Sequence, residues 1–313
     1  DGDDYLNTGT SESNAFQTIE TALALIDPDS LNAITINLTE GIFSPSTTGE
    51  SFPILMISNV NLIGQGEEVT IIDAEQTGRV ITIENCENNT ISDMTIKGGT
   101  TGEVIESGGG INIVDSELIN INNMIFENNT SHNGGAIKIE DAQLNLSSLN
   151  IHDNIGVWNG GGISIFDSFA ILEDINIYNN SANVGGGLSL VLTDAILNNV
   201  NIHDNIGYYL SPGLFFQFSN PIFSSENRCN IYNNSYTVST QDQSDDTENL
   251  VRNFGKDIYY DYHYHDCSLW FDQNNCIVSD IYGCTWDEET ETCYNISEEL
   301  ISIILDTFSV IMP

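Results

Sequence analysis

Basic residues are nearly absent from this chain. Six lysines and arginines stand against 46 aspartates and glutamates in 313 residues, so the formal net charge is −40. A protein that binds nucleic acid needs lysine and arginine to neutralise phosphates, and one that docks on an anionic membrane surface needs them too. The composition therefore argues against both partners and favours cations, basic partners or simple solubility.

Several familiar motifs are missing as well. The chain has no GxSxG elbow, no Walker loop and no HExxH motif, so those nucleophile, nucleotide and zinc chemistries have no support. The apolar segment Leu300–Met312 is too short to span a bilayer and contains Asp306. No secretory leader is visible, and a start at Asp1 is what a processed mature product would show. We therefore expect a secreted chain without a membrane span.

Cysteines are few and unevenly placed. The chain has six, with no CxxC pair, which makes a zinc site unfavourable. Four of them cluster towards the C-terminus, as in a small disulfide-stapled module of an oxidising compartment. Six cysteines allow fifteen pairings, and we favour a local set among these four. The predicted disulfide residues are Cys267, Cys276, Cys284 and Cys293.

Asparagine, by contrast, is abundant, and eight asparagines begin Asn-x-Ser/Thr sequons. Such sequons are acceptors of N-linked glycans in secreted proteins. Together with the cysteine cluster they predict an N-glycosylated protein that is extracellular or on the cell surface. The predicted glycosylation sites are Asn37, Asn88, Asn128, Asn129, Asn145, Asn179, Asn233 and Asn295.

Internal repetition is the strongest signal. Four segments open with glycines, alternate apolar residues and close on an asparagine, at spacings of 25, 26 and 25 residues between Asn129, Asn154, Asn180 and Asn205. A longer fifth copy closes at Asn234, which implies an inserted bulge or loop. The glycines allow a left-handed backbone or a close approach at a corner. The closing asparagines could take the left-handed conformation and bond along a stack.

The apolar positions keep their register from copy to copy. Leu146 matches Leu172 and Leu197, and the alternation within each copy has the period of a strand. Two or three short strands cannot bury an apolar face alone, but coils stacked at about 4.8 Å do so. We therefore predict an all-β right-handed parallel β-helix, a solenoid. Cys229 stands in register with Val200, so it could be a buried core thiol.

The ends of such a solenoid need caps. Residues Ala15–Ile26 are helical by pattern, with Asn14 as a candidate N-cap, and we expect them to form an N-terminal capping helix. We predict that residues 1–260 form the capped β-helix, with regular coils over about 108–234. Residues 261–313 are expected to form a small C-terminal Cys-rich module with an apolar tail.

Two phrases resemble known families. FENNTSHNGGAI, at Phe126–Ile137, has the FxxN and GGAI elements of the repeats in chlamydial polymorphic outer-membrane proteins, although later copies lose the phenylalanine. The opening DGDD, then AFQTIETALALI and EGIF, look like the N-terminal cap of many pectin-lyase-like β-helix proteins. The resemblance covers about residues 1–260. It implies the fold and leaves the activity open, since this fold serves lyases, hydrolases, adhesins and structural proteins.

Two kinds of carbohydrate chemistry can be tested against the residues. Lyases of this fold use a lysine or arginine base with calcium bound by carboxylates. Hydrolases use aspartates on neighbouring coils, and Asp153 and Asp204 fall at equivalent corners two coils apart, about 9.6 Å, within reach of an inverting pair. Turns also favour aspartate for purely structural reasons. The available basic residues are scattered: Arg79, Lys97, Lys138, Arg228, Arg252 and Lys256.

A column of outward-facing residues is a second candidate functional site. His152 and His203 align with Glu127, Tyr178 and Tyr232, which suits a ridge that binds a sugar or partner, a weak metal pair or a solvated corner.

Two further candidates lie near the ends of the chain. His263 and His265 share one face of a period-two segment beside Asp261 and Asp266, either a metal site or a strand edge. Calcium is the one cofactor we consider, and its candidate ligands are Asp1, Asp3 and Asp4. The other interpretation is a flexible acidic N-terminus with no cofactor.

Two functions follow as hypotheses. The first is a non-catalytic extracellular structural or adhesive protein, a stiff glycosylated rod in a surface coat, filament or appendage. Leu300–Pro313 could then add to the next subunit and give head-to-tail self-association. The alternative is a carbohydrate-active enzyme, a polysaccharide lyase or hydrolase of the pectin-lyase-like class.

Overall fold

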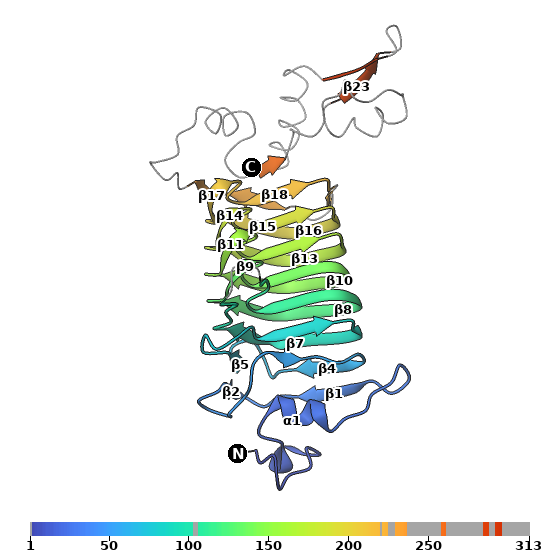
Figure 1. Cartoon of the computed structure of the whole chain (residues 1–313), viewed down its shortest axis with the longest axis vertical. Helices are drawn as coiled ribbons and strands as arrows, with labels where there is room; N and C mark the ends of the chain where they lie inside the picture. Colours follow the sequence, from blue (N-terminus) through green and yellow to red (C-terminus); the bar gives the residue numbers. More distant parts are fainter. Residues whose placement is uncertain are drawn as a thin grey trace. The chain divides into compact units, whose positions relative to one another are not determined.

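The structure is a computed structural model that describes residues 2–102, 106–219, 221–224 and 229–236, with three short strands beyond them. The chain divides into two compact units, Asp1–Tyr259 and Tyr260–Pro313. The first unit is a parallel β-solenoid of about seven turns, which confirms the fold predicted from the repeats. Figure 1 shows its coils stacked in chain order from α1 to β18.

The solenoid strands pair in parallel with their equivalents one coil away. A large sheet winds around most of each coil, and a smaller sheet closes it. The large sheet contains β1 (Ile34–Asn37), β2 (Gly41–Phe43), β3 (Ile54–Leu55), β4 (Val60–Ile63), β5 (Thr70–Asp73), β6 (Ile81–Glu84), β7 (Glu87–Lys97), β8 (Ile111–Glu127), β10 (Ile137–His152), β12 (Ile163–Phe166), β13 (Phe169–Tyr178), β15 (Leu188–Val191), β16 (Asp194–His203), β18 (Leu214–Gln217), β19 (Ile222–Phe223) and β20 (Asn230–Tyr232). The smaller sheet contains β9 (Thr130–Asn133), β11 (Ile155–Asn159), β14 (Ser181–Val184), β17 (Ile206–Leu210) and β21 (Ser235–Tyr236).

One coil shows how the sequence builds the turn. Gly160 opens it with φ +61, β12 and β13 follow, and β14 closes it. Left-handed residues bend the chain between straight segments: Asp167, Asp174 and Asn179 have φ between 42 and 54. The coil therefore has four short strand segments, one or two more than the sequence pattern predicts, because the segment after the closing asparagine lacks an apolar alternation.

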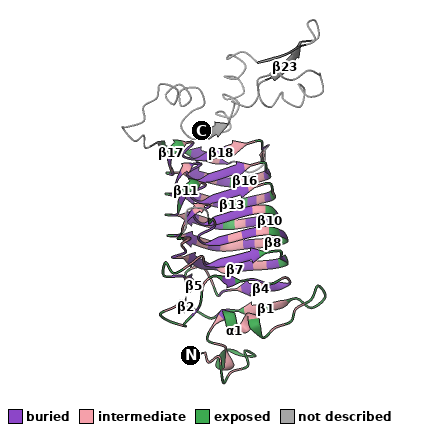
Figure 2. Ribbon diagram, viewed as in Figure 1, coloured by how far each residue is buried: buried purple, intermediate pink, exposed green. Residues whose placement is uncertain are grey.

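Inward-facing residues form continuous apolar columns. Leu146 pairs in register with Leu172, and Leu172 with Leu197; all three are fully buried. Burial of a leucine side chain stabilises the fold by about 1.5–3 kcal/mol. Figure 2 shows the coil strands mostly buried, with exposed residues gathered at the corners and around α1. Cys229 is a buried free thiol in the position of Val200, as predicted.

The N-terminal helix is shorter than predicted. A 3-10 turn, η1, covers Glu12–Asn14, and α1 covers only Ile19–Ala24. Thr18, not Asn14, is the N-cap, and its side chain accepts a hydrogen bond from the amide of Thr21. The buried carboxylate of Glu50 accepts hydrogen bonds from the backbone amides of Ile19 and Glu20. A distant glutamate, which the local pattern cannot reveal, thus helps to fix where the helix begins.

The described strands beyond residue 236 are β22 (Ile258–Tyr260), β23 (Cys284–Asp287) and β24 (Thr292–Asn295). β23 and β24 form an antiparallel pair that sets Cys284 opposite Asn295 and Cys293 opposite Trp286. Cys267 and Cys276 lie outside the described residues, so the four-cysteine disulfide set remains a prediction. Within the part of the chain that the structure describes, no helix is long and apolar enough to cross a membrane.

Candidate functional site

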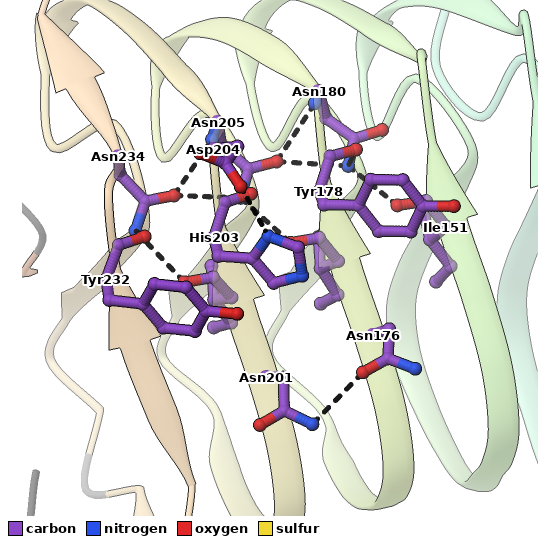
Figure 3. A network of polar contacts seen from close by, with 12 residues as sticks. Ile151, Asn176, Tyr178, Asn180, Asn201, His203, Asp204, Asn205, Tyr232 and Asn234 are labelled. Carbon is purple, nitrogen blue, oxygen red and sulfur yellow. Dashed lines mark hydrogen bonds and ion pairs between the residues drawn. The ribbon is translucent and has the colours of Figure 1, made fainter. Parts of the chain in front are cut away.

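The outward side of the coils carries an asparagine ladder, formed by Asn150, Asn176, Asn201 and Asn230 of β10, β13, β16 and β20. Alternate residues of a strand point outward, and matching registers place these side chains one coil apart. The amide nitrogens of Asn176, Asn201 and Asn230 donate to the amide oxygen of the ladder asparagine on the preceding coil, at 3.1, 3.0 and 2.7 Å. Figure 3 shows the Asn176–Asn201 step. The polar groups of this face are thus bonded to one another.

A ring ladder runs beside it, formed by His152, Tyr178, His203 and Tyr232. Consecutive ring centroids lie 4.9, 5.3 and 4.9 Å apart, with interplanar angles of 23, 3 and 13°. Such pairs contribute about 0.5–1.5 kcal/mol beyond their buried area. Figure 3 shows three of these rings, those of Tyr178, His203 and Tyr232, side by side on successive coils. The aligned column predicted from the sequence is therefore confirmed as a stack.

The two aspartates at the corner after the ring ladder are each paired with their own histidine. The Nδ1 atoms of His152 and His203 lie 2.8 and 2.7 Å from carboxylate oxygens of Asp153 and Asp204. An ionised carboxylate only accepts hydrogen bonds, so Nδ1 is the donor and Nε2 is left as the outer nitrogen. The coil of Tyr178 and Asn179 lies between the pairs. The structure therefore holds two separate Asp–His pairs on alternate coils.

Tyr178 lies on the coil between the Asp153–His152 and Asp204–His203 pairs. Burial raises the pKa of its phenol, and the carboxylates of Asp153 and Glu127 raise that pKa further. Glu127 is in register with His152 on the preceding coil, where the ring ladder starts. The phenol therefore stays protonated, as a hydrogen-bond donor on the outer edge of the ladder.

A second asparagine ladder lies inside the same corner. It is formed by the closing asparagines predicted from the repeats, all of them buried: Asn129, Asn154, Asn180, Asn205 and Asn234. The left-handed residue is the one before each of them, for example Asn179 with φ 54, so the predicted left-handed role of the closing asparagine is wrong. The predicted bonding along the stack is confirmed, because each side-chain amide from Asn129 to Asn205 donates to the next closing asparagine, where no water could replace it.

The ladder bears on the glycosylation sites. Asn129 is fully buried, and its side-chain nitrogen donates to the Ile96 carbonyl and to Asn154 Oδ1. A glycan cannot be accommodated there, so the expectation for Asn129 is corrected. The side chain of Asn295 is not among the described ones. The other sequon asparagines are exposed: Asn37, Asn88, Asn128, Asn145, Asn179 and Asn233.

The described basic side chains are engaged by the coils themselves. Arg79 donates to the carbonyls of Ser107 and Gly108 and to Thr82 Oγ1. Lys97 lies 3.7 Å from Asp73, and the buried Lys138 lies 3.4 Å from Glu140. Burial lowers the pKa of Lys138, although Glu140 opposes this shift. Arg228, Arg252 and Lys256 lie outside the described residues.

The N-terminal aspartates are also used locally. Asp3 accepts hydrogen bonds from the amides of Tyr5 and Leu6. Asp4 accepts from Gln17 and Thr18; burial alone would raise its pKa, but these hydrogen bonds outweigh burial and lower it. In the described ranges, no group of three or more His, Cys, Asp or Glu side chains could hold a metal ion. Asp1 and the segment with His263, His265, Asp261 and Asp266 lie outside those ranges.

The sequence reasoning missed the small sheet of β9, β11, β14, β17 and β21. Its strands do not alternate apolar and polar residues over a detectable length. The sequence signal that could have revealed these strands is a difference in length between alternate coils. β11 and β17 have five residues, IGVWN and IGYYL, whereas β9 and β14 have four, TSHN and SANV. The longer strands carry the additional aromatic residues.

Comparisons with known proteins go no further than the fold. No family model and no curated protein matches the chain. A pectin methylesterase mutant in complex with a hexasaccharide is 14% identical with a TM-score of 0.35, and Geobacillus virus E2 ORF18 is 11% identical with a TM-score of 0.33. Each alignment covers 70% of this chain, which spans only 66% and 56% of those proteins, less than two thirds.

The A-module of the Azotobacter vinelandii mannuronan C-5 epimerase AlgE4 is 13% identical, with a TM-score of 0.19 over 66% of this chain and 91% of the module. Similarity at this level says nothing about activity. None of these three is a chlamydial outer-membrane protein, so the resemblance to chlamydial repeats remains a prediction from the sequence.

Proposed function

We propose that the chain is a non-catalytic, N-glycosylated extracellular protein with a structural or adhesive role, as part of a surface coat, filament or appendage. The outer asparagine ladder is the observation that carries this proposal. Its amides bond from coil to coil at 2.7–3.1 Å, so these outward asparagine side chains reinforce a rod and do not converge on a reaction centre. A rod whose coils are cross-bonded inside and out suits a mechanical or display role.

Glycans would lie on several sides of the rod. Asn128, Asn179 and Asn233 occupy the same corner on alternate coils, and Asn145 lies on another side, beside Asn120. Large solvated groups along a rod hinder side-to-side aggregation, which an exposed β-structure otherwise risks. The high negative charge acts in the same direction.

Self-association would use the N-terminal end. β1 pairs with β4 and β2 with β5, and among the described residues neither strand has a partner on its other side. A hollow of about 1890 Å³ lies between these strands and the N-terminal segment. Residues 300–313 of another copy, rich in β-branched and apolar side chains, would add to this edge as a strand and produce a head-to-tail filament.

The alternative is a carbohydrate-active enzyme of the pectin-lyase-like class. Asp153 and Asp204 favour it, because they recur on alternate coils with a histidine on each carboxylate. A hydrolase would use them as acid and base on either side of a glycosidic bond. The engaged states of Arg79, Lys97 and Lys138 speak against a lyase that uses one of these three as its base.

Expression in a eukaryotic secretory host tests the proposal. The expected product is secreted, loses mass on treatment with a peptide-N-glycosidase, and forms rods or filaments in negative-stain electron microscopy. A variant that lacks residues 300–313 should remain as single rods, and Asn129→Gln should leave the glycan mass unchanged. Turnover of any plant, algal or microbial polysaccharide that is lost in both Asp153→Asn and Asp204→Asn would establish the enzyme instead.

A further inference from the structure

The small sheet has a β-bulge in every second coil. Between positions that pair in register, β11 has Val157 and Trp158 where β9 has only His132, and it has three residues where β14 has two. β17 likewise has Tyr208 and Tyr209 where β14 has only Asn183. A bulge places two successive side chains outside the regular alternation of a strand. Both pairs are therefore presented to solvent.

The exposure of these side chains is high for their size. Trp158 is 49% exposed and Val157 53%, and Tyr208 and Tyr209 are 48% and 56% exposed. Single exposed apolar residues are ordinary, whereas apolar side chains that gather on one surface beside polar ones mark an interaction site. We call these four residues and the strands that carry them the bulge face.

The bulge face repeats every two coils. Trp158 and Tyr209 are 51 positions apart, as are His152 and His203 of the same coils. Two coil spacings amount to about 10 Å. Asn183 occupies the coil between the two bulges, with a polar side chain of the size that bonds hydroxyl groups. A ligand that matches the face must be flat, hydroxylated and periodic over the same distance.

We propose that the bulge face binds an uncharged, extended polysaccharide chain that runs along the coil stack. One sugar ring packs its apolar face on Trp158, and the ring two units further packs on the Tyr208–Tyr209 pair. In an equatorially linked polysaccharide, alternate sugar rings present the same face. The distance between two such rings is comparable to two coil spacings. This inference rests on the proposed adhesive role and supplies its ligand.

The negative charge of the protein distinguishes between uncharged and anionic polysaccharides. The chain carries a net charge of −40, and Asp153 and Asp204 lie just before β11 and β17, the two strands that bear the bulges. A polyuronate would be repelled by this field, whereas an uncharged chain is indifferent to it. The proposal therefore predicts binding to cellulose or chitin and not to polygalacturonate.

Depletion of the full, glycosylated chain by insoluble cellulose and chitin tests the inference. Trp158→Ala and Tyr209→Ala should each weaken binding about 3- to 10-fold, and the double variant should abolish it. Tyr5→Ala is the matched control, since Tyr5 is an aromatic residue 97% exposed in a turn of the N-terminal segment. Trp158→Phe keeps a flat ring and should retain binding, and an unchanged unfolding midpoint shows that each variant is folded.

Three results would overturn the inference: no depletion of the wild type by either polymer, equal binding to polygalacturonate, or the same loss with Tyr5→Ala. If the double variant instead changes only the sedimentation coefficient, the bulge face is a contact between copies. The proposed surface role fails separately, through absence from the secreted fraction or through turnover of the bound polymer.

Discussion

Asn205 receives two hydrogen bonds from Asn180 on a single oxygen. The backbone amide of Asn180 lies 2.9 Å from Asn205 Oδ1, and the Asn180 side-chain nitrogen lies 3.1 Å from the same atom. That nitrogen also donates to the carbonyls of Ile151 and Tyr178 (Figure 3). One buried side chain therefore ties together three successive coils at the point where each coil turns.

This relationship predicts a large effect of Asn180→Ala. The truncation leaves the backbone and side-chain donors of Asn154 without their acceptor, in a place closed to water. Unsatisfied buried groups cost about 1–3 kcal/mol each, so we expect a loss of about 2–4 kcal/mol in the free energy of unfolding, measured in guanidinium. Asn201→Ala removes an equivalent amide from the outer ladder and should cost less than about 1 kcal/mol. Equal losses would contradict the distinction between the two ladders.

A second prediction concerns close approach at a glycine. A β-carbon on Gly161 would collide with the carbonyl oxygen of Gly186 on the next coil and with that of Ser181 in β14. Because these are backbone atoms of a paired sheet, they cannot move aside independently. Gly161→Ala should destabilise the chain by about 1–3 kcal/mol, seen as a lower midpoint of thermal unfolding. Gly102→Ala, at a position with open space around it, is the control and should leave that midpoint unchanged.

The sequence predicts those features of the fold that follow from the local repeat. It does not predict features that depend on contacts between residues far apart in the chain. Periodicity predicts the coil and the stack of Leu146, Leu172 and Leu197, because identical positions on successive coils must coincide. The cap is misjudged because Glu50, thirty residues away, sets the start of α1. The burial of Asn129 is missed because a sequon and a ladder residue look alike until the coil closes over one of them.

The third prediction is a pH dependence at the N-terminal end. Burial raises the pKa of Glu50, although the amides of Ile19 and Glu20 oppose this shift. Because the folded pKa lies above the unfolded one, the contribution to stability is full below the unfolded pKa and is lost as pH rises through the folded pKa. Protection of the α1 amides from hydrogen exchange, corrected for intrinsic rates, should therefore fall as pH increases.

Glu50→Gln has no titrating group at this position, so its protection should not follow the same pH course. Glu12→Gln, which leaves the Glu50 contacts intact, should behave as the wild type. A wild-type profile that rises with pH, or one that is parallel to that of Glu50→Gln, would show that Glu50 does not govern the docking of α1.

A final prediction follows from an acidic column at the corner after the first strand segment. Asp115, Asp141 and Asp167 occupy equivalent left-handed positions on three successive coils. Desolvation by its surroundings raises the pKa of the exposed Asp141, and the charges of Asp167 and Asp115 raise it further. Its folded pKa thus exceeds the unfolded one, so its charge destabilises the fold at neutral pH. Asp141→Asn should therefore raise the thermal midpoint, since asparagine also tolerates the left-handed backbone.

Salt distinguishes this electrostatic cause from a packing effect. The gain from Asp141→Asn should be largest at low ionic strength and shrink in molar salt, because exposed charges are screened. Asp194→Asn removes the same charge from a position paired with Phe169, which carries none, and should give a smaller gain at low salt. If both variants gain equally, the benefit comes from lowering the net charge of the chain and not from relieving the stacked column.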